Sequence, residues 1–294
     1  MENLRAIALM IASMALFAVS DAFIKAVGGS LPTAQLIIVM GLGTAFGFAL
    51  ICRAQGIAVF SRVFFHPAVL ARNLSEMLGA IGFITALVTI PLSVASSILQ
   101  AAPLVITMGA ALLLGEAVGW RRWSAIAIGF VGVLIIVRPG AEAFDPNMLW
   151  ALLGVFGLAG RDLASRAVPN AIPNVQLATY GSSMLIPAGI LVMPISDPML
   201  WPDVATWVLV ALIVAFGATG YLAITAASRL GDVGAVTPFR YTRLIFALAI
   251  GIFFFGERPD LATYLGAALI VGSGLFTIWR ERQRLRGDAA PLPR

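Results

Sequence analysis

The sequence predicts an all-α integral membrane protein with ten transmembrane helices, arranged as two inverted five-helix repeats. Three observations lead to it: the composition, the number of long apolar runs, and a stretch that occurs twice. Hydrophobic residues make up 60% of the 294 residues and charged residues 11%, against roughly 45–50% and 25% in soluble domains. A soluble surface cannot be built from so few charges, so the chain belongs in a membrane.

The internal repeat is seen most clearly near the end of the first apolar run. The stretch SDAFIKAVGGSLPTAQL is matched in the second half by RDLASRAVPNAIPNVQL. Asp21 aligns with Asp162, and Lys25 aligns with Arg166, without a gap. Both alignments share one offset, which indicates two copies of one unit.

The same offset holds further along the chain. It places Glu116 of one Gly-Glu pair on Glu257 of another, so the match extends over about a hundred positions. We therefore divide the chain into a first copy at residues 1–139, a second copy at 140–280 and a cytoplasmic tail at 281–294.

The first copy contains five runs long enough to cross a bilayer, which takes about 20 mainly apolar residues. These runs must be helices, because lipid offers no hydrogen-bond partner to an open backbone. Gly28-Gly29, Pro91 and Pro139-Gly140 mark three of the joints. The expected spans are residues 4–27, 32–52, 71–90, 94–114 and 122–138.

The second copy repeats this layout with five further runs. Pro169 and Pro173 precede its second span, Pro198 and Pro202 its third, and Pro259 its last. The expected spans are residues 147–167, 174–194, 204–227, 233–255 and 261–280.

The basic residues predict the orientation in the membrane. If the N-terminus is cytoplasmic, only Lys25, Arg138 and Arg258 fall in the outer segments. Basic residues gather on the cytoplasmic side, so both termini are expected in the cytoplasm of a cell with a bacterial-type inner membrane. Five spans per copy then invert the second copy relative to the first, as in secondary transporters that alternate access around a central site. The inner segments hold Arg5, Arg53, Arg62, Arg72, Arg121, Arg122, Arg166, Arg229, Arg280, Arg282, Arg284, Arg286 and Arg294.

The end of each copy resembles a known family. The first copy ends ITMGAALLLGEAVGWRRWSAIAIGF, and the second ends IGIFFFGERPDLATYLGAALIVGSG. An apolar run closed by Gly-Glu, a charged turn and a Gly-rich last span is similar to EamA-type members of the drug/metabolite transporter superfamily, as is the earlier FAVSDAFIKAV. The resemblance implies ten helices in two halves that move small organic metabolites, often amino acids or vitamins. Many members have a basic residue in the second span where this chain has Met40, so that substrate contact is not carried over.

The two aligned aspartates are candidate functional residues, since a charge within the hydrocarbon region is costly. Asp21 and Asp162 could take up and release protons during a transport cycle. In that case Asp21→Asn abolishes transport without loss of folded protein. Alternatively, Asp21 pairs with Lys25 and Asp162 with Arg166, four residues apart on one helix, and anchors a helix end.

The ninth span carries the most unusual charges, in the stretch VTPFRYTRLIFAL. Arg240 and Arg243 are three residues apart, hence on one face, with Tyr241 between them. Arginines at this depth need acidic partners such as Glu76, or an anionic substrate group. They either hold spans together or bind a carboxylate or phosphate of the substrate.

The fourth span provides further candidates around Pro103, at a depth similar to that of Pro238 in the ninth. Broken helices at matching depths point to a binding site, although prolines also simply bend helices. Gln100 beside this proline and Tyr221 in the eighth span join the candidate substrate-binding residues, which are Arg240, Arg243, Tyr241, Gln100, Glu76 and Tyr221.

Enzyme functions find little support. The only histidine, His66, lies in a joint, and the only cysteine, Cys52, excludes an internal disulfide and a cysteine metal cluster. No zinc-protease, serine-hydrolase or phosphate-loop motif is present, so no cofactor or metal is expected and ATP is not the direct energy source.

The sequence therefore predicts a secondary-active transporter of small organic metabolites that works by alternating access. Amino acids or related compounds, moved outward, are the leading substrate class. Alternatives are uptake of a vitamin such as riboflavin or of an adenosine-containing metabolite, and, in another class, a membrane scaffold or lipid-modifying enzyme. The expected partners are the substrate and the lipid bilayer, with a homodimer possible and no nucleic acid.

Overall fold

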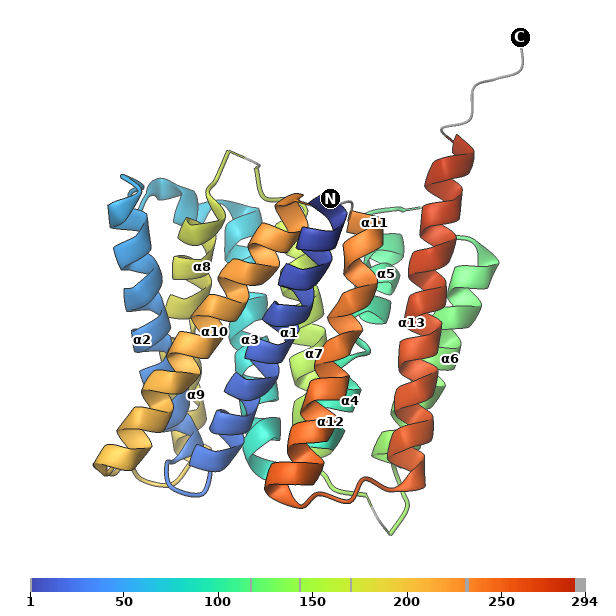
Figure 1. The fold of residues 1–294 in the computed structure, drawn as a ribbon. Helices are drawn as coiled ribbons and strands as arrows, with labels where there is room; N and C mark the ends of the chain where they lie inside the picture. Colours follow the sequence, from blue (N-terminus) through green and yellow to red (C-terminus); the bar gives the residue numbers. More distant parts are fainter. Residues whose placement is uncertain (1, 117, 143, 170, 231–232, 289–294) are drawn as a thin grey trace.

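The computed structural model is all-helical in the residues it describes, which are all except 1, 117, 143, 170, 231–232 and 289–294 (Figure 1). The helices lie side by side as one bundle. We call the end where α1 begins and α13 finishes the terminal end, and the opposite end the far end (Figure 1). The α-helices are α1 (Glu2–Val27), α2 (Thr33–Ala54), α3 (Pro67–Thr89), α4 (Leu92–Leu99), α5 (Ala102–Leu113), α6 (Trp120–Val137), α7 (Met148–Ser165), α8 (Asn174–Ser183), α9 (Leu185–Val192), α10 (Val204–Leu230), α11 (Val233–Val236), α12 (Thr242–Phe255) and α13 (Leu261–Asp288), and the 3-10 helices are η1 (Arg62–Phe65), η2 (Met193–Ile195) and η3 (Thr237–Tyr241).

Nine helical segments of the described chain are long and apolar enough to cross a membrane, and each matches one of the ten expected spans. The remaining expected span is α3, which packs inside the bundle against α7. Arg72, Asn73 and Glu76 make the first half of α3 more polar than the other spans. The last helix is longer than expected, since α13 continues past residue 280 to Asp288 through residues that favour helices. The rest of the expected tail, residues 289–294, lies outside the described part.

Three of the expected spans are interrupted in the structure. The span expected at residues 174–194 divides at Met184 into α8 and α9, which the sequence did not predict. The other two, which we call the broken spans, are interrupted near the prolines singled out in the sequence. The fourth span divides at Gln100 and Ala101 into α4 and α5, with Pro103 in the first turn of α5. The ninth divides into α11, η3 and α12, with Pro238 inside η3. Proline lacks the backbone donor that a continuous helix needs, which accounts for both interruptions.

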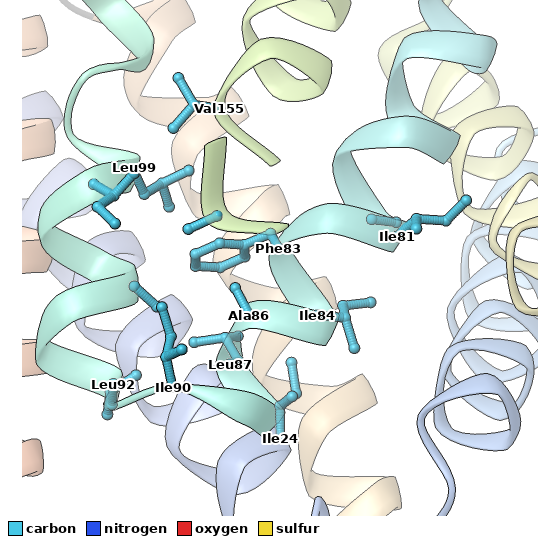
Figure 2. Packing of buried hydrophobic residues seen from close by; sticks show 14 of the residues in the cluster. Ile24, Ile81, Phe83, Ile84, Ala86, Leu87, Ile90, Leu92, Leu99 and Val155 are labelled. Atoms are coloured by element: carbon cyan, nitrogen blue, oxygen red, sulfur yellow. The ribbon is translucent and has the colours of Figure 1, made fainter. Parts of the chain in front are cut away.

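The apolar core follows α3 and α4 where they meet α1 and α7 (Figure 2). Leu87, Ile90 and Leu92 are fully buried there, and Phe83 points toward α7. Large apolar side chains such as Phe253 and Phe254 instead lie on the outside of the bundle, which is the surface that lipid would cover.

The contact between α3 and α7 is unusually close because glycines face each other across it. A Cβ added to Gly82 would lie 2.3 Å from the backbone nitrogen of Gly154, and one added to Gly157 would lie 2.2 Å from that of Gly79. Small residues let membrane helices approach at backbone distance, where dispersion contacts are densest. These four glycines therefore set the spacing between α3 and α7.

We expect Gly82→Ala to lower the stability by about 1–3 kcal/mol, because the added methyl meets backbone that cannot move aside. The measurement is the apparent melting temperature of the purified protein in detergent. Gly47→Ala in α2 is the matched control, since its Cβ would meet nothing within 4 Å. An equal effect of both substitutions would contradict the close contact between α3 and α7.

Candidate functional site

The two arginines of the ninth span reach the two aligned aspartates. Arg243 Nη2 lies 2.7 Å from Asp21 Oδ2 on α1, and Arg240 Nη2 lies 3.5 Å from Asp162 Oδ2 on α7. The sequence predicted that both arginines lie on one face of one helix. However, η3 ends and α12 begins between them, and the two side chains contact different helices. The ninth span thus contacts both of the aligned aspartates.

The contact of Asp21 with Arg243 is a closed, buried ion pair. Both Arg243 Nε and Nη2 donate to the carboxylate, at 2.7–3.1 Å, and the Asp21 side chain is only 5% exposed. The guanidinium also lies over the rings of Phe17, at 5.1 Å, and Phe83, at 5.3 Å. The pair therefore joins α1, α3 and α12, and the Arg243 side chain is 18% exposed.

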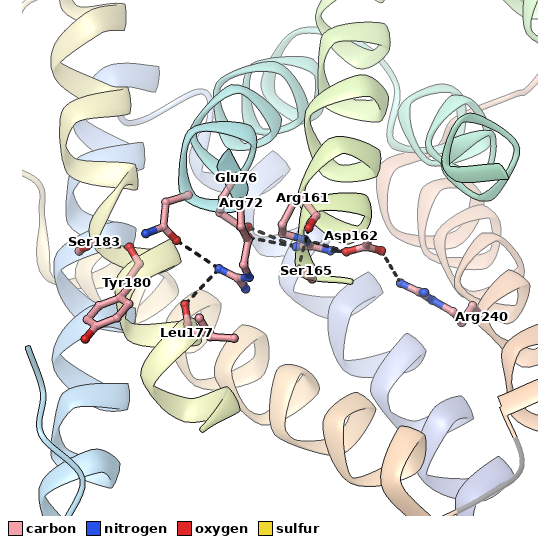
Figure 3. A network of polar contacts seen from close by, with 10 residues as sticks. Arg72, Glu76, Arg161, Asp162, Ser165, Leu177, Tyr180, Ser183 and Arg240 are labelled. Carbon is pink, nitrogen blue, oxygen red and sulfur yellow. Dashed lines mark hydrogen bonds and ion pairs between the residues drawn. The ribbon is translucent and has the colours of Figure 1, made fainter. Parts of the chain in front are cut away.

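The contact of Asp162 is the end of a longer series of charges, which we call the charge chain: Arg72, Glu76, Arg161, Asp162 and Arg240 (Figure 3). Glu76 Oε2 lies 3.9 Å from Arg72, and its Oε1 lies 3.2 Å from Arg161 Nη1. Arg161 then donates to Asp162 at 2.8–2.9 Å. The charge chain therefore runs from α3 through α7 to η3.

Exposure rises along the charge chain. The side chain of Arg72 is 5% exposed and donates to the carbonyl of Leu177, whereas that of Arg240 is 37% exposed. The 3.5 Å contact of Arg240 is also longer than either contact of Arg161. Three arginines against two carboxylates leave one positive charge in excess. The exposed end at Arg240 is thus suited to an anionic group, and Asp162 beside it to a cationic one.

The other candidate residues lie in different surroundings. Gln100 donates its Nε2 to the carbonyl of Tyr241, at 3.2 Å, and so connects the two broken spans. The phenol of Tyr241 points at Gly274 of α13, away from the charge chain. Tyr221 packs edge-on against Phe48, 5.3 Å between ring centroids, within electrostatic reach of the charge chain.

The alternative pairing of each aspartate with the cation four residues later is wrong. Lys25 Nζ lies 3.9 Å from Glu257 and Arg166 Nη1 lies 2.8 Å from Glu116. Both cations lie at the ends of their helices, where acids of other spans approach more closely than the aspartate one turn back. Lys25 and Arg166 therefore bridge separate helices.

Sequence reasoning missed two members of the charge chain and two further acids. Arg72 was counted as a topology signal, but it is buried in α3, and Arg161 was not singled out although it adjoins Asp162. Charged residues close to a span end look alike in sequence whether they face water or the bundle. Glu116 and Glu257 did carry a signal, because the Gly-Glu pair is duplicated at the repeat offset.

Known proteins resemble this chain over most of its length. A riboflavin transporter of Rhizobium johnstonii is 31% identical, covering 84% of this chain and 82% of that protein. An S-adenosylmethionine uptake transporter of Rickettsia bellii is 27% identical, over 76% of each chain. A pseudopaline exporter of Pseudomonas aeruginosa is 26% identical, over 87% of this chain and 89% of that one.

A solved structure and a family model also match this chain. A crystal structure superposes with a TM-score of 0.63 at 17% identity, covering 93% of this chain and 98% of that one, which is a likeness of fold. The model of the EamA-like transporter family matches residues 146–279. Together with the extent of the match to the riboflavin transporter, this shows that the chain is a multi-pass membrane transporter of small molecules, not an enzyme, and belongs to the EamA-like transporter family.

Proposed function

We propose that the protein is a secondary-active transporter that works by alternating access and binds its substrate beside Arg240. The observation that carries this proposal is the charge chain, which ends in a partly exposed arginine at the break of the ninth span. Within the described part of the chain this guanidinium forms one ion pair, at 3.5 Å, and such a contact can be exchanged for a substrate carboxylate at little cost. Broken helices in membrane transporters supply such sites near mid-depth.

The substrate class we propose is amino acids and related compounds. The excess positive charge favours a carboxylate at Arg240, and Asp162 offers a partner for an ammonium or sulfonium group. S-adenosylmethionine, which a relative takes up, carries all three groups. Efflux is the proposed direction. Uptake of riboflavin or of an adenosine-containing metabolite is the alternative, and it has the support of the riboflavin transporter and the S-adenosylmethionine uptake transporter among the relatives.

Alternating access rests on an inverted repeat of residues 1–139 and 140–280, and the helix contacts support that arrangement. The first span α1 packs against α10, the third span of the other copy, and α7 packs correspondingly against α3. The second spans meet each other, as α2 with α8 and α9, and so do the last spans, α6 and α13. Each contact between a helix of one copy and a helix of the other therefore has a counterpart in which the two copies have changed roles.

Polar contacts follow the same exchange. Gln35 at the start of α2 donates to the carbonyl of Leu200, and Gln176 at the start of α8 donates to that of Ala58. Both glutamines fasten a second span to the joint that follows the second span of the other copy. Gln100 and Tyr241, which touch, also occupy aligned positions. We place the protein in a bacterial-type inner membrane. The distribution of basic residues indicates that both termini lie on its cytoplasmic side.

Ligand-induced thermal stabilisation tests this proposal. We expect an amino acid, S-adenosylmethionine or riboflavin to raise the stability of the purified protein, by about 2.7 kcal/mol at a hundredfold excess over its Kd. Arg240→Gln should remove the effect and leave the melting temperature of the free protein nearly unchanged.

Arg121→Gln is the control, because Arg121 lies outside the charge chain and stacks on Trp120. A response that survives Arg240→Gln would move the site elsewhere. No response in any class, from protein that is verified as folded, would contradict the proposed substrate classes.

A further inference from the structure

Two ion pairs of the protein occupy aligned positions in the two copies. Lys25 aligns with Arg166, and Glu116 aligns with Glu257. Lys25 binds Glu257 at 3.9 Å, and Arg166 binds Glu116 at 2.8 Å. Each pair therefore takes its cation from one copy and its carboxylate from the other.

The two pairs lie at opposite ends of the bundle. Lys25 is in the last turn of α1, at the far end, and Arg166 follows α7 at the terminal end (Figure 1). Glu257 follows α12 and Glu116 follows α5, which are the last segments of the two broken spans. Each pair thus fastens the first span of one copy to the broken span of the other. We call them the far-end pair (Lys25–Glu257) and the terminal-end pair (Arg166–Glu116).

The far-end pair is reinforced by the backbone of the first broken span. Glu257 accepts hydrogen bonds from the backbone nitrogens of Leu92, at 2.6 Å, and Ser93, at 2.9 Å, which are the first residues of α4. Lys25 donates to the carbonyl of Ile90, at 2.8 Å. A carboxylate on the free amides of a helix start is a strong, charge-assisted contact. The far-end pair thus holds α1, α4 and α12 together.

The terminal-end pair is open to its surroundings. Its side chains are 47% and 41% exposed, against 19% and 9% in the far-end pair. The two pairs occupy aligned positions, but the far-end pair is largely buried and the terminal-end pair is exposed. An exposed pair contributes little and separates readily, whereas a buried one separates only when its helices move apart.

A cavity of about 240 Å³ adjoins the far-end pair and is lined by Ser93 and Glu257, among others. The ion pair between Arg138 and Asp260 lies on its wall. Hydrogen bonds from Arg138 and Thr263 lower the pKa of Asp260 to about 2, so this wall remains charged at neutral pH. The cavity thus reaches the carboxylate side of the far-end pair.

We propose that these two ion pairs are the gates of the transporter, one for each end of the bundle. Breaking the far-end pair opens the far end, and breaking the terminal-end pair opens the terminal end. Both pairs are formed in the structure, so both gates are shut. This inference rests on the proposed alternating access and adds the residues that control it.

A single reporter thiol tests both gates. Cys52→Ser removes the native thiol, and Ser93→Cys places a new one beside Glu257. Ser93 is 1% exposed, and its hydroxyl has no hydrogen-bond partner among the described residues, so the change is nearly isosteric. The measurement is the rate of labelling by a membrane-impermeant thiol reagent, applied separately to each side of oriented vesicles.

The two gates predict opposite effects on this one reporter. We expect Glu257→Gln to raise the labelling rate about tenfold or more, because it removes two charge-assisted hydrogen bonds. We expect Glu116→Gln to lower the rate by about two- to fivefold, because opening the terminal end is favoured at the expense of the far end. Asp197→Asn, at an exposed acid of the far-end loop, should leave the rate unchanged.

Different outcomes would contradict the gates and the proposed alternating access. A reporter that is labelled from neither side in the parent protein would refute alternating access. A labelled parent in which both glutamine variants change the rate in the same direction, or not at all, would overturn the gates. A purely structural role predicts that same-direction result, since loss of either contact would loosen the bundle.

Discussion

Asp21→Asn is expected to lower the stability of the protein by about 3–5 kcal/mol and to abolish transport. The substitution leaves Arg243 charged and buried between Phe17 and Phe83, with its bidentate partner gone. Removing one member of a buried ion pair costs that much because the remaining charge has no compensation. The measurements are the apparent melting temperature and the yield of monodisperse protein in detergent.

The double variant Asp21→Asn with Arg243→Gln provides the control. Removing both charges leaves no uncompensated ion, so we expect it to recover much of the stability lost by the single variant. A single variant that folds with an unchanged melting temperature but does not transport would contradict this structural role. It would instead support a proton-carrying role for Asp21, the possibility that the sequence left open.

Arg161→Gln is expected to have the second largest effect, a loss of about 1.5–3 kcal/mol. Arg161 is the centre of the charge chain, where it donates to Asp162 at 2.9 Å and to Glu76 at 3.2 Å. Its replacement leaves two partly buried carboxylates of neighbouring helices without the cation between them. The measurement is again the apparent melting temperature, compared with that of Arg240→Gln.

Arg240→Gln is the matched variant within the same charge chain. Arg240 is the exposed end of the charge chain, and its contact with Asp162 is longer than either ion pair of Arg161. Its loss should therefore leave the melting temperature nearly unchanged while it removes ligand binding. The two variants together divide the charge chain into a structural part at Arg161 and a binding part at Arg240. Equal destabilisation by both would mean that Arg240 is also structural and would weaken the proposed substrate site.

The lengths and positions of most spans could be predicted from the sequence. Bilayer thickness requires about 20 apolar residues per crossing, so the runs near residues 4–27 and 204–227 predicted α1 and α10 almost to their ends. The breaks near Pro103 and Pro238 were legible for a similarly local reason, since proline interrupts a helix wherever it stands inside one. The family resemblance likewise followed from short motifs that can be read along the chain.

The partners of the charges were decided only by the tertiary structure. Helical periodicity shows which residues share one face of one helix, and on that basis Lys25 was placed with Asp21. The actual partner, Glu257, is remote in sequence and is reached because α12 ends beside the last turn of α1. Burial of Arg72 and the separate partners of Arg240 and Arg243 have the same cause. The apolar pattern determined that helices form and span the membrane, whereas their packing order determined which charges meet.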